Sequence, residues 1–208
     1  MEQTLIAFSQ VTKATGKLRG DTLFSCKAPP ENLYYLEQGF AKITRTNGDK
    51  HEAIFAFLGP GSICGDSLHF GESAFRYSAC MLTDGIVREI PLEVYAHFCR
   101  SDARAWRWVA ELEARRRTRL EKRIEIMCIA DARRRLMALI PFLVLQYKFP
   151  RQEDGSYVLP LKQSEFASLI GSTRETTSSM LNNLARANLI RLGRGRLIVP
   201  DLKAFEYD

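Results

Sequence analysis

Between Ala103 and Cys128 the chain contains no glycine or proline, and strong helix formers dominate this stretch. The pattern predicts one helix of roughly 40 Å at 1.5 Å per residue, too long to lie on a small domain alone. Apolar side chains recur every three or four residues at both ends of the stretch, at Trp106, Val109, Leu112, Leu120, Ile124 and Met127. A helix of this kind typically pairs with a second copy of itself, so we expect a homodimer.

The middle of this helix is rich in arginine, at Arg115, Arg116, Arg117 and Arg119. Two interpretations are open. The arginines lie in solvent or pair with acids such as Glu113 and Glu121, or they line a polar pocket shared by two subunits. Facing rows of arginine repel each other, so the second interpretation implies an anionic ligand at the seam.

The segment before the helix reads as short strands separated by turns. Strand patterns recur about every 8–12 residues from position 18 to position 90, which is typical of an all-β sandwich or roll. Asn47-Gly48 is the strongest hairpin signal, and residues 52–58 form the expected return strand. From Pro91 the pattern becomes helical, with a short helix over 92–99 and an N-cap at Ser101-Asp102 for the long one.

Charge is distributed unevenly along the 208 residues. Residues 1–99 hold 9 Lys/Arg against 11 Asp/Glu, residues 100–136 hold 12 against 6, and residues 137–208 hold 9 against 7. A near-neutral front and a basic rear are typical of nucleic-acid binding, although a solvated basic helix face gives the same count. The longest apolar stretch is far shorter than the roughly 18 residues a membrane span needs, and the N-terminus lacks a signal peptide, so we expect a cytoplasmic protein with no membrane partner.

Motifs for catalysis and for metal binding are missing from the sequence. It has five cysteines but no CxxC pair, and three histidines that are not paired at a catalytic spacing. It also has no phosphate-binding loop and no nucleophile elbow. We therefore expect that the protein is not an enzyme and that it has no catalytic residue and no metal site.

The segment 161–184 predicts a helix-turn-helix. Phe166, Ala167 and Ile170 form the apolar face of a first helix, and Gly171 supplies the left-handed residue for a tight turn. Thr173 is a good N-cap for a second helix, which buries Thr177, Met180, Leu181 and Leu184. Before this motif, Asp131 caps a helix over 132–147, in which Pro141 predicts a kink or an early end.

The exposed start of the second helix has the side chains that read DNA. Arginine can bind guanine O6 and N7 in a bidentate manner, and glutamate can accept from cytosine N4, so Arg174 and Glu175 are base-reading candidates. A following hairpin with two arginines at its tip fits the sugar-phosphate backbone. The full set of candidate DNA-binding residues is Ser164, Thr173, Arg174, Glu175, Thr176, Ser178, Ser179, Arg194 and Arg196.

These motifs resemble the winged helix-turn-helix of the CRP/FNR family of bacterial transcription regulators. The segment from Gly171 to Thr176 and the later Asn188-Leu189-Ile190 match that motif, and Gly20-Asp21, Glu37-Gln38-Gly39 and Gly59-Pro60-Gly61 are similar to the family's cyclic-nucleotide-binding β-roll. The resemblance implies an α+β chain with three parts. They are an antiparallel, jelly-roll-like sensor over residues 1–99, a dimerisation helix over 100–128 and a winged helix-turn-helix over 129–208.

The resemblance also implies partners. It predicts a homodimer on a pseudo-palindromic double-stranded DNA site, with half-sites about one helical turn apart, and contact with RNA polymerase. Ser179 stands where many family members carry a second base-reading arginine. Because a hydroxyl cannot reach guanine in the same way, we expect the preferred half-site to differ at that base.

The effector site is the part that the sequence defines least. By resemblance it would be formed by Gly65, Asp66, Ser67, Arg76, Tyr77, Arg116, Leu120 and Glu121. Asp66 is one methylene shorter than the family's glutamate, Tyr77 follows Arg76 where a hydroxyl residue is expected, and Leu120 and Glu121 replace hydroxyl residues, which together weigh against tight cyclic AMP binding. We assign no cofactor.

Several alternatives stay open. They are haem at His51, His69 or His97, a thiol switch at Cys64 or Cys80, another small effector, or no effector at all. An iron–sulfur cluster has little support, because no cysteine precedes Cys26. A different class of function is a nucleotide-binding module that regulates a protein partner.

Overall fold

The computed structural model describes residues 12–29, 31–46, 52–65, 73–101 and 103–205. Two compact units make up the chain. The first contains residues 1–45 and 55–118, and the second contains residues 46–54 and 119–208.

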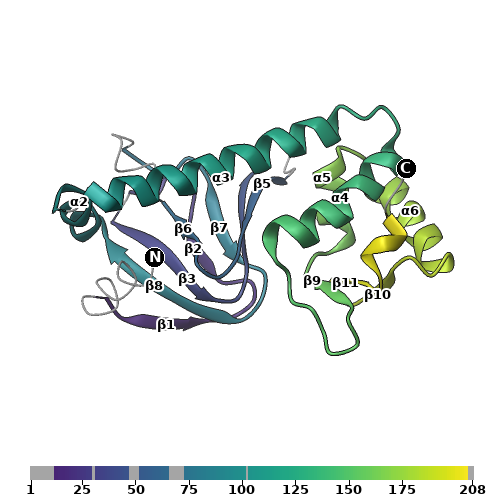
Figure 1. Cartoon of the computed structure of the whole chain (residues 1–208), viewed down its shortest axis with the longest axis horizontal. Helices are drawn as coiled ribbons and strands as arrows, with labels where there is room; N and C mark the ends of the chain where they lie inside the picture. The colour runs from purple at the N-terminus through teal and green to yellow at the C-terminus, as the bar shows by residue number, and fades with distance from the viewer. Residues whose placement is uncertain (1–11, 30, 47–51, 66–72, 102, 206–208) are drawn as a thin grey trace. The chain divides into compact units, whose positions relative to one another are not determined.

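The first unit is built on two four-stranded antiparallel sheets (Figure 1). Their strand orders are β1-β8-β3-β6 and β2-β7-β4-β5, so most neighbouring strands come from distant parts of the chain, whereas β4 and β5 are consecutive. Leu33 pairs with Ile90 and Leu36 with Val87, and all four side chains are fully buried. The bounds are β1 Ala14–Lys17, β2 Thr22–Phe24, β3 Asn32–Gln38, β4 Ala41–Thr46, β5 Glu52–Leu58, β6 Ile63–Cys64, β7 Ser78–Met81 and β8 Gly85–Pro91.

These strands confirm the predicted β-roll, and aromatic rings fill part of its interior. Phe24 stacks on Phe75 with ring centroids 4.0 Å apart, and it also contacts Tyr34 at 5.4 Å. Burying a side chain of this size contributes roughly 1.5–3 kcal/mol. The predicted Asn47-Gly48 turn lies outside the described residues.

Two helices follow the roll, α2 (Leu92–Ser101) and α3 (Ala103–Met127). The predicted cap at Ser101 is wrong, because this residue belongs to α2 and its hydroxyl donates to the carbonyl of Phe98. Asp102 lies outside the described residues. Pro91 ends β8 and so precedes the first turn of α2 instead of lying in it.

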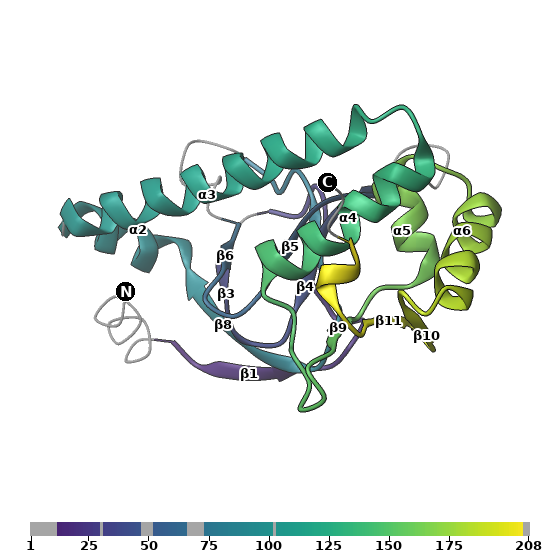
Figure 2. The same ribbon diagram turned by 45° about the vertical axis from the view of Figure 1, so that its right-hand side comes forward.

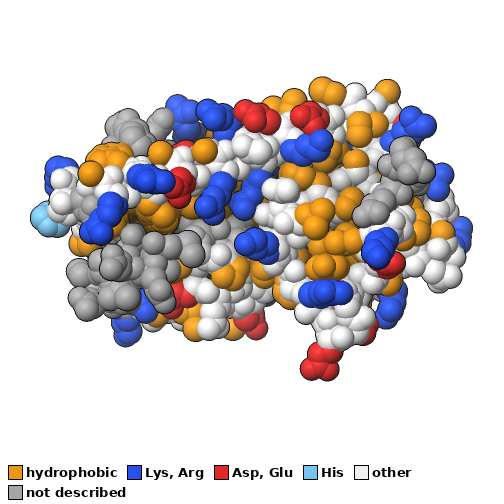
Figure 3. All heavy atoms as spheres, viewed as in Figure 1, with side chains coloured by type: hydrophobic (Ala, Val, Ile, Leu, Met, Phe, Trp, Pro, Cys, Tyr) orange, Lys and Arg blue, Asp and Glu red, His pale blue; other side chains and the backbone are white. Residues whose placement is uncertain are grey.

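The long helix serves two different purposes along its length. Val109, which we expected on a partner-facing seam, is only 4% exposed and packs in the roll core, with Leu112 against the same cluster. Farther along α3, by contrast, Leu120, Ile124 and Met127 are 49%, 55% and 40% exposed. Figure 3 shows basic side chains along the line of α3 with hydrophobic ones between them. Trp106, near the start of α3, is also 41% exposed. The exposed apolar side chains that recur at helical spacing, however, lie in the C-terminal part of the helix.

The second unit places helices beside a three-stranded sheet of order β10-β11-β9. Asp131 caps α4 as predicted, accepting from the backbone N–H of Arg134 at 2.8 Å. The expected early end at Pro141 is wrong, because α4 continues six residues beyond it, with Phe142, Leu143 and Val144 buried. The bounds are α4 Ala132–Tyr147, β9 Tyr157–Leu159, α5 Gln163–Ile170, α6 Arg174–Arg186, β10 Arg191–Gly193, β11 Arg196–Val199 and the 3-10 helix η2 Leu202–Phe205.

Among the described residues, no helix combines the length and the apolar character needed to cross a bilayer.

Candidate nucleic-acid interface

The turn between α5 and α6 is the local feature that positions the interface. Gly171 ends α5 with φ of 60°, a left-handed conformation that favours glycine. Thr173 then caps α6, and its hydroxyl oxygen accepts from the N–H of Thr176 at 3.1 Å. Phe166, Ile170 and Leu181 are buried between the helices. Both the predicted helix-turn-helix and its capping residue are confirmed.

Arg174 and Glu175 occupy the first two positions of α6 and are exposed. Within the part of the chain that the structure describes, neither side chain has a hydrogen-bond or ion-pair partner. An arginine and a glutamate without internal partners, on a capped helix end, are available to an external ligand. This arrangement is the one required for base-edge contacts in the major groove.

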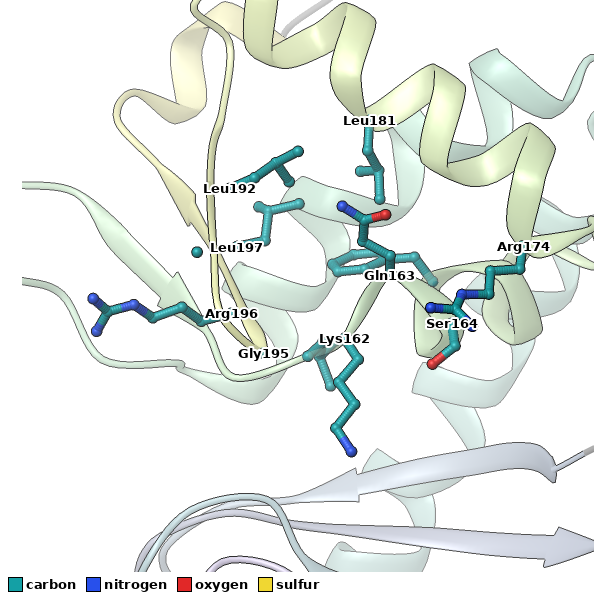
Figure 4. A pocket seen from close by; sticks show the side chains of 12 residues that line it. Lys162, Gln163, Ser164, Arg174, Leu181, Leu192, Gly195, Arg196 and Leu197 are labelled. Carbon is teal, nitrogen blue, oxygen red and sulfur yellow. The ribbon is translucent and has the colours of Figure 1, made fainter.

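A cleft of about 290 Å³ lies beside this helix end, between the start of α5 and the hairpin β10-β11. Ser164 and Arg174 line it, and Figure 4 shows these two side chains next to each other. Lys162 and Arg196 also line the cleft, and in the same view both extend away from its centre. Three cations, Lys162, Arg174 and Arg196, thus border this cleft within the second unit.

Lys162 and Gln163 are cleft residues that sequence reasoning missed. Their position is set by Glu165, a buried residue whose carboxylate accepts from the N–H of Lys162 at 2.7 Å. This contact fixes the first turn of α5 as half of a capping box. The available signal was a lysine three residues before a glutamate at a helix start.

The other candidate DNA-binding residues lie around this core. Arg194 is exposed in the turn between β10 and β11. Ser179 is exposed and Ser178 half-buried on α6. Thr176 is exposed, and its hydroxyl oxygen accepts from the hydroxyl of Thr173 at 2.9 Å, which leaves its own O–H to donate outward.

In the first unit, the predicted effector residues differ from one another in exposure and in their contacts. Gly65 has φ of 91°, and a Cβ placed on it would lie 3.1 Å from the Phe75 ring, so the backbone closely approaches the aromatic cluster there. Arg76 is exposed, and Tyr77 packs on the exposed ring of Phe55 with centroids 4.8 Å apart. Asp66 and Ser67 lie outside the described residues.

Arg116 comes from α3 to the same region of the first unit. Its guanidinium donates to the carbonyl of Ile63, two residues before Gly65, and to the carboxylate of Glu113. Of the two interpretations of the arginine-rich stretch, pairing with an acid thus holds for Arg116. Leu120 and Glu121 are exposed on the part of α3 that belongs to the second unit.

Two groups near this region have raised pKa values. Burial, followed by the negative charge of Glu89, raises the pKa of Tyr34 to about 12. Burial also raises the pKa of the Cys99 thiol. Both groups are therefore neutral at physiological pH, and neither adds charge to the roll.

The histidines and cysteines bear on the sensor alternatives. His97 is exposed on α2, whereas His51 and His69 lie outside the described residues. Cys64 is buried, and its thiol donates to the carbonyl of Tyr34 at 3.6 Å, while Cys80 is half-buried. No cluster of three or more His, Cys, Asp or Glu suited to a metal ion occurs among the described residues.

Two family models match successive parts of the chain. Residues 18–102 match the cyclic nucleotide-binding domain, and residues 134–207 match the Crp-like helix-turn-helix domain. The chain is 29% identical over 175 residues to the cyclic AMP receptor protein of Thermus thermophilus, covering 84% of this chain and 77% of the relative. It is 27% identical over 193 residues to a CRP-like cAMP-activated global transcriptional regulator of Mycobacterium tuberculosis, covering 88% and 82%.

Solved structures agree on the fold. A CRP-family transcriptional regulator from Thermus thermophilus superposes with a TM-score of 0.78 at 24% identity, covering 92% of this chain and 94% of that one. The observed α+β architecture, a β-roll followed by a long helix and a winged helix-turn-helix, is the one shared by these proteins. The chain therefore belongs to the CRP/FNR family and is a DNA-binding transcription regulator.

Proposed function

We propose that the protein acts as a homodimer that reads a pseudo-palindromic duplex with one α6 in each of two successive major grooves. The observation that carries this proposal is the exposed, internally unpartnered Arg174-Glu175 pair at the capped start of α6, as far as the described residues extend. Arg174 would bind guanine and Glu175 would accept from cytosine. At the position of Ser179 many family members have a second base-reading arginine. Here the shorter serine side chain would face that base instead.

The surrounding polar residues would hold the backbone. Thr173, Thr176, Ser178 and Ser164 offer hydroxyls near the helix end, and Arg194 and Arg196 add charge from the hairpin. Such contacts set the register of the protein on the duplex without reading its sequence. Lys162, which borders the same cleft, joins this group.

Dimerisation would use the exposed stripe on α3. Leu120, Ile124 and Met127 are spaced four and three residues apart, so they share one helix face, and each is at least 40% exposed. A second copy covers this face with the same residues, as in a parallel coiled coil. The proposed domain limits are 1–99, 100–128 and 129–208.

For the effector we propose a small ligand held near Gly65, Asp66, Ser67, Arg76, Tyr77 and Arg116, with Leu120 and Glu121 contributing from α3. Two relatives are named for cyclic AMP. In this chain, however, Arg116 is already engaged by Glu113 and Ile63. A regulator that works without an effector is the alternative.

We assign no catalytic activity, and we place the protein in the cytoplasm with RNA polymerase as a further partner.

The decisive experiment is selection of bound duplexes from a random pool, followed by native mass spectrometry of the purified protein. We expect an enriched site with two-fold symmetry, half-sites about one turn apart and a dimer mass. A dimer with an added small mass would identify the effector. If no duplex is enriched while a protein partner is retained, the nucleotide-binding regulatory module becomes the better interpretation.

A further inference from the structure

Three consecutive arginines occupy the first turn of α4, and they differ sharply in their contacts. Arg135 is anchored: its guanidinium donates to the carbonyls of Ile170 at 3.0 Å, Ile129 at 2.8 Å and Ala130 at 3.2 Å. Arg133 and Arg134 are exposed, and no described residue pairs with their side chains. Two free guanidinium groups therefore stand beside a fixed one.

The two free arginines do not stabilise their own helix. Positive charge in the first turn opposes the helix dipole, and this turn contains no acidic residue to offset it. Asp131 caps the backbone N–H of Arg134, and among the described residues it makes no ion pair with that side chain. Side chains placed at an electrostatic cost and left unpaired in the folded chain are candidates for contact with an external anion.

Arg135 fixes where this pair lies. Its bond to Ile170 ties the start of α4 to the last residue of α5, and Ile170 is followed within three residues by Thr173, the cap of α6. Figure 2 shows the segment before α4 and the turn between α5 and α6 at the same end of the second unit. Arg133 and Arg134 thus flank the recognition helix start on the side of this turn.

Two of the three cleft cations, Lys162 and Arg196, lie toward the other end of α5. Lys162 and Ser164 lie at the other end of α5, next to the hairpin with Arg196. An eight-residue helix spans about 12 Å, which equals the approximate width of the major groove. The Ile170 carbonyl, which anchors the first turn of α4, and the start of α5 next to Lys162 are therefore about one major-groove width apart.

We propose that Arg133 and Arg134 bind backbone phosphates on the rim of the major groove opposite to the rim held by Lys162 and the hairpin. The inference rests on the proposed DNA-reading role of α6. Arginine suits this task because its planar guanidinium binds phosphate oxygens in a bidentate manner. The contacts carry no base specificity, so they strengthen binding to every sequence.

The test compares R133Q/R134Q with K148Q on the selected duplex. Lys148 follows the other end of the same helix and is exposed without a side-chain partner among the described residues, so K148Q controls for loss of positive charge. Affinity is measured by fluorescence anisotropy between about 50 and 200 mM salt, where phosphate contacts dominate the salt dependence. Phosphate-ethylation interference on both strands locates each contact.

We expect the double variant to lower the log–log salt slope by about 1.8 per protomer, because each contact contributes about 0.9. Affinity at ~0.1 M salt should fall at least tenfold, while discrimination against a mutated half-site stays the same. Ethylation interference should vanish on one rim of the groove only. K148Q should lower the slope by less than about 0.5. Thermal unfolding of the double variant should not occur at a lower temperature than that of the unaltered protein.

Other outcomes overturn the proposal. An unchanged slope, or an equal drop for K148Q, shows that these arginines do not bind phosphate. Unchanged DNA binding with a loss of transcription activation assigns the surface to a protein partner. If the unaltered protein binds no duplex at all, the proposed DNA-reading function itself fails, and this result is distinct from failure of the arginine contacts.

Discussion

The start of α6 and the region around Gly65 differ in whether their charged side chains have partners within the protein. At the start of α6, Arg174 and Glu175 are exposed and have no partner among the described residues. Near Gly65, Arg116 donates to a carboxylate and to a backbone carbonyl of the same unit. The first region offers charge to an external ligand, whereas the second satisfies much of its charge internally.

This difference explains why the family resemblance says more about DNA than about the effector. Base reading needs a few exposed side chains on one capped helix, and that requirement is local. An effector site combines side chains from several strands and a helix, and here part of that set already has partners. An anion entering the roll would have to compete with Glu113 for Arg116. The relatives named for cyclic AMP therefore suggest a cyclic nucleotide as effector, whereas the contacts of Arg116 in this chain weigh against it.

The largest expected effect comes from the exposed stripe of α3. Ile124→Glu places a charge at the centre of the apolar face and should abolish the dimer, measured by sedimentation velocity. Affinity for the two-fold symmetric duplex should then fall by roughly 10²–10⁴, because the two α6 helices no longer bind together. Lys122→Gln on the opposite face makes the same change in net charge and should leave the dimer intact. A dimeric Ile124→Glu protein would contradict the proposed seam.

A smaller effect is expected from the base-reading pair. Arg174→Ala should cost about 1–3 kcal/mol on the preferred duplex and relax the preference at one base pair. Binding to single-base variants of the selected site measures both effects. Arg186→Ala is the matched control, because Arg186 lies exposed at the other end of α6 and donates to Asn183 within its own helix. Equal loss on every duplex would assign Arg174 to the backbone instead of the bases.

The same locality explains what the sequence could predict. Gly171, Thr173 and the apolar positions of α5 and α6 are separated by only a few residues, so capping and periodicity were enough to define the helix-turn-helix. The β-roll was also predictable, because its turns recur at regular intervals. Pro141 was misleading because burial of Phe142, Leu143 and Val144 keeps α4 helical beyond it.

Features that depend on distant parts of the chain could not be predicted in this way. Val109 fits an apolar periodicity, yet nothing local says whether the roll or a second helix covers it, and the roll does. Arg135 and Ile170 are 35 residues apart, so their contact required the structure. Lys162 likewise becomes part of the interface only because the hairpin folds next to the start of α5.

Arg116→Gln tests whether the internal contacts of the roll are structural. Loss of the guanidinium leaves the Ile63 carbonyl without its donor, so the free energy of unfolding should fall by about 1–2 kcal/mol in the absence of any effector. Urea denaturation followed by tryptophan fluorescence measures the change. Arg115→Gln removes the same charge from an exposed neighbour and should stay within about 0.5 kcal/mol. Unchanged stability would instead favour an arginine held in place for a ligand.

The smallest expected effect separates the two faces of α6. The Thr177 side chain is fully buried, and its hydroxyl is the buried side-chain polar atom that has no hydrogen-bond partner among the described residues. Thr177→Val keeps the shape and removes the unsatisfied group, so the protein should gain about 1 kcal/mol in urea denaturation, with its base preference unchanged. Thr176→Val makes the same substitution on the exposed face and should weaken DNA binding without any gain in stability. If Thr177→Val instead destabilises the protein, the Thr177 hydroxyl has a hydrogen-bond partner in solution. The burial of a side chain on α6 then does not predict whether it contributes to stability or to DNA binding.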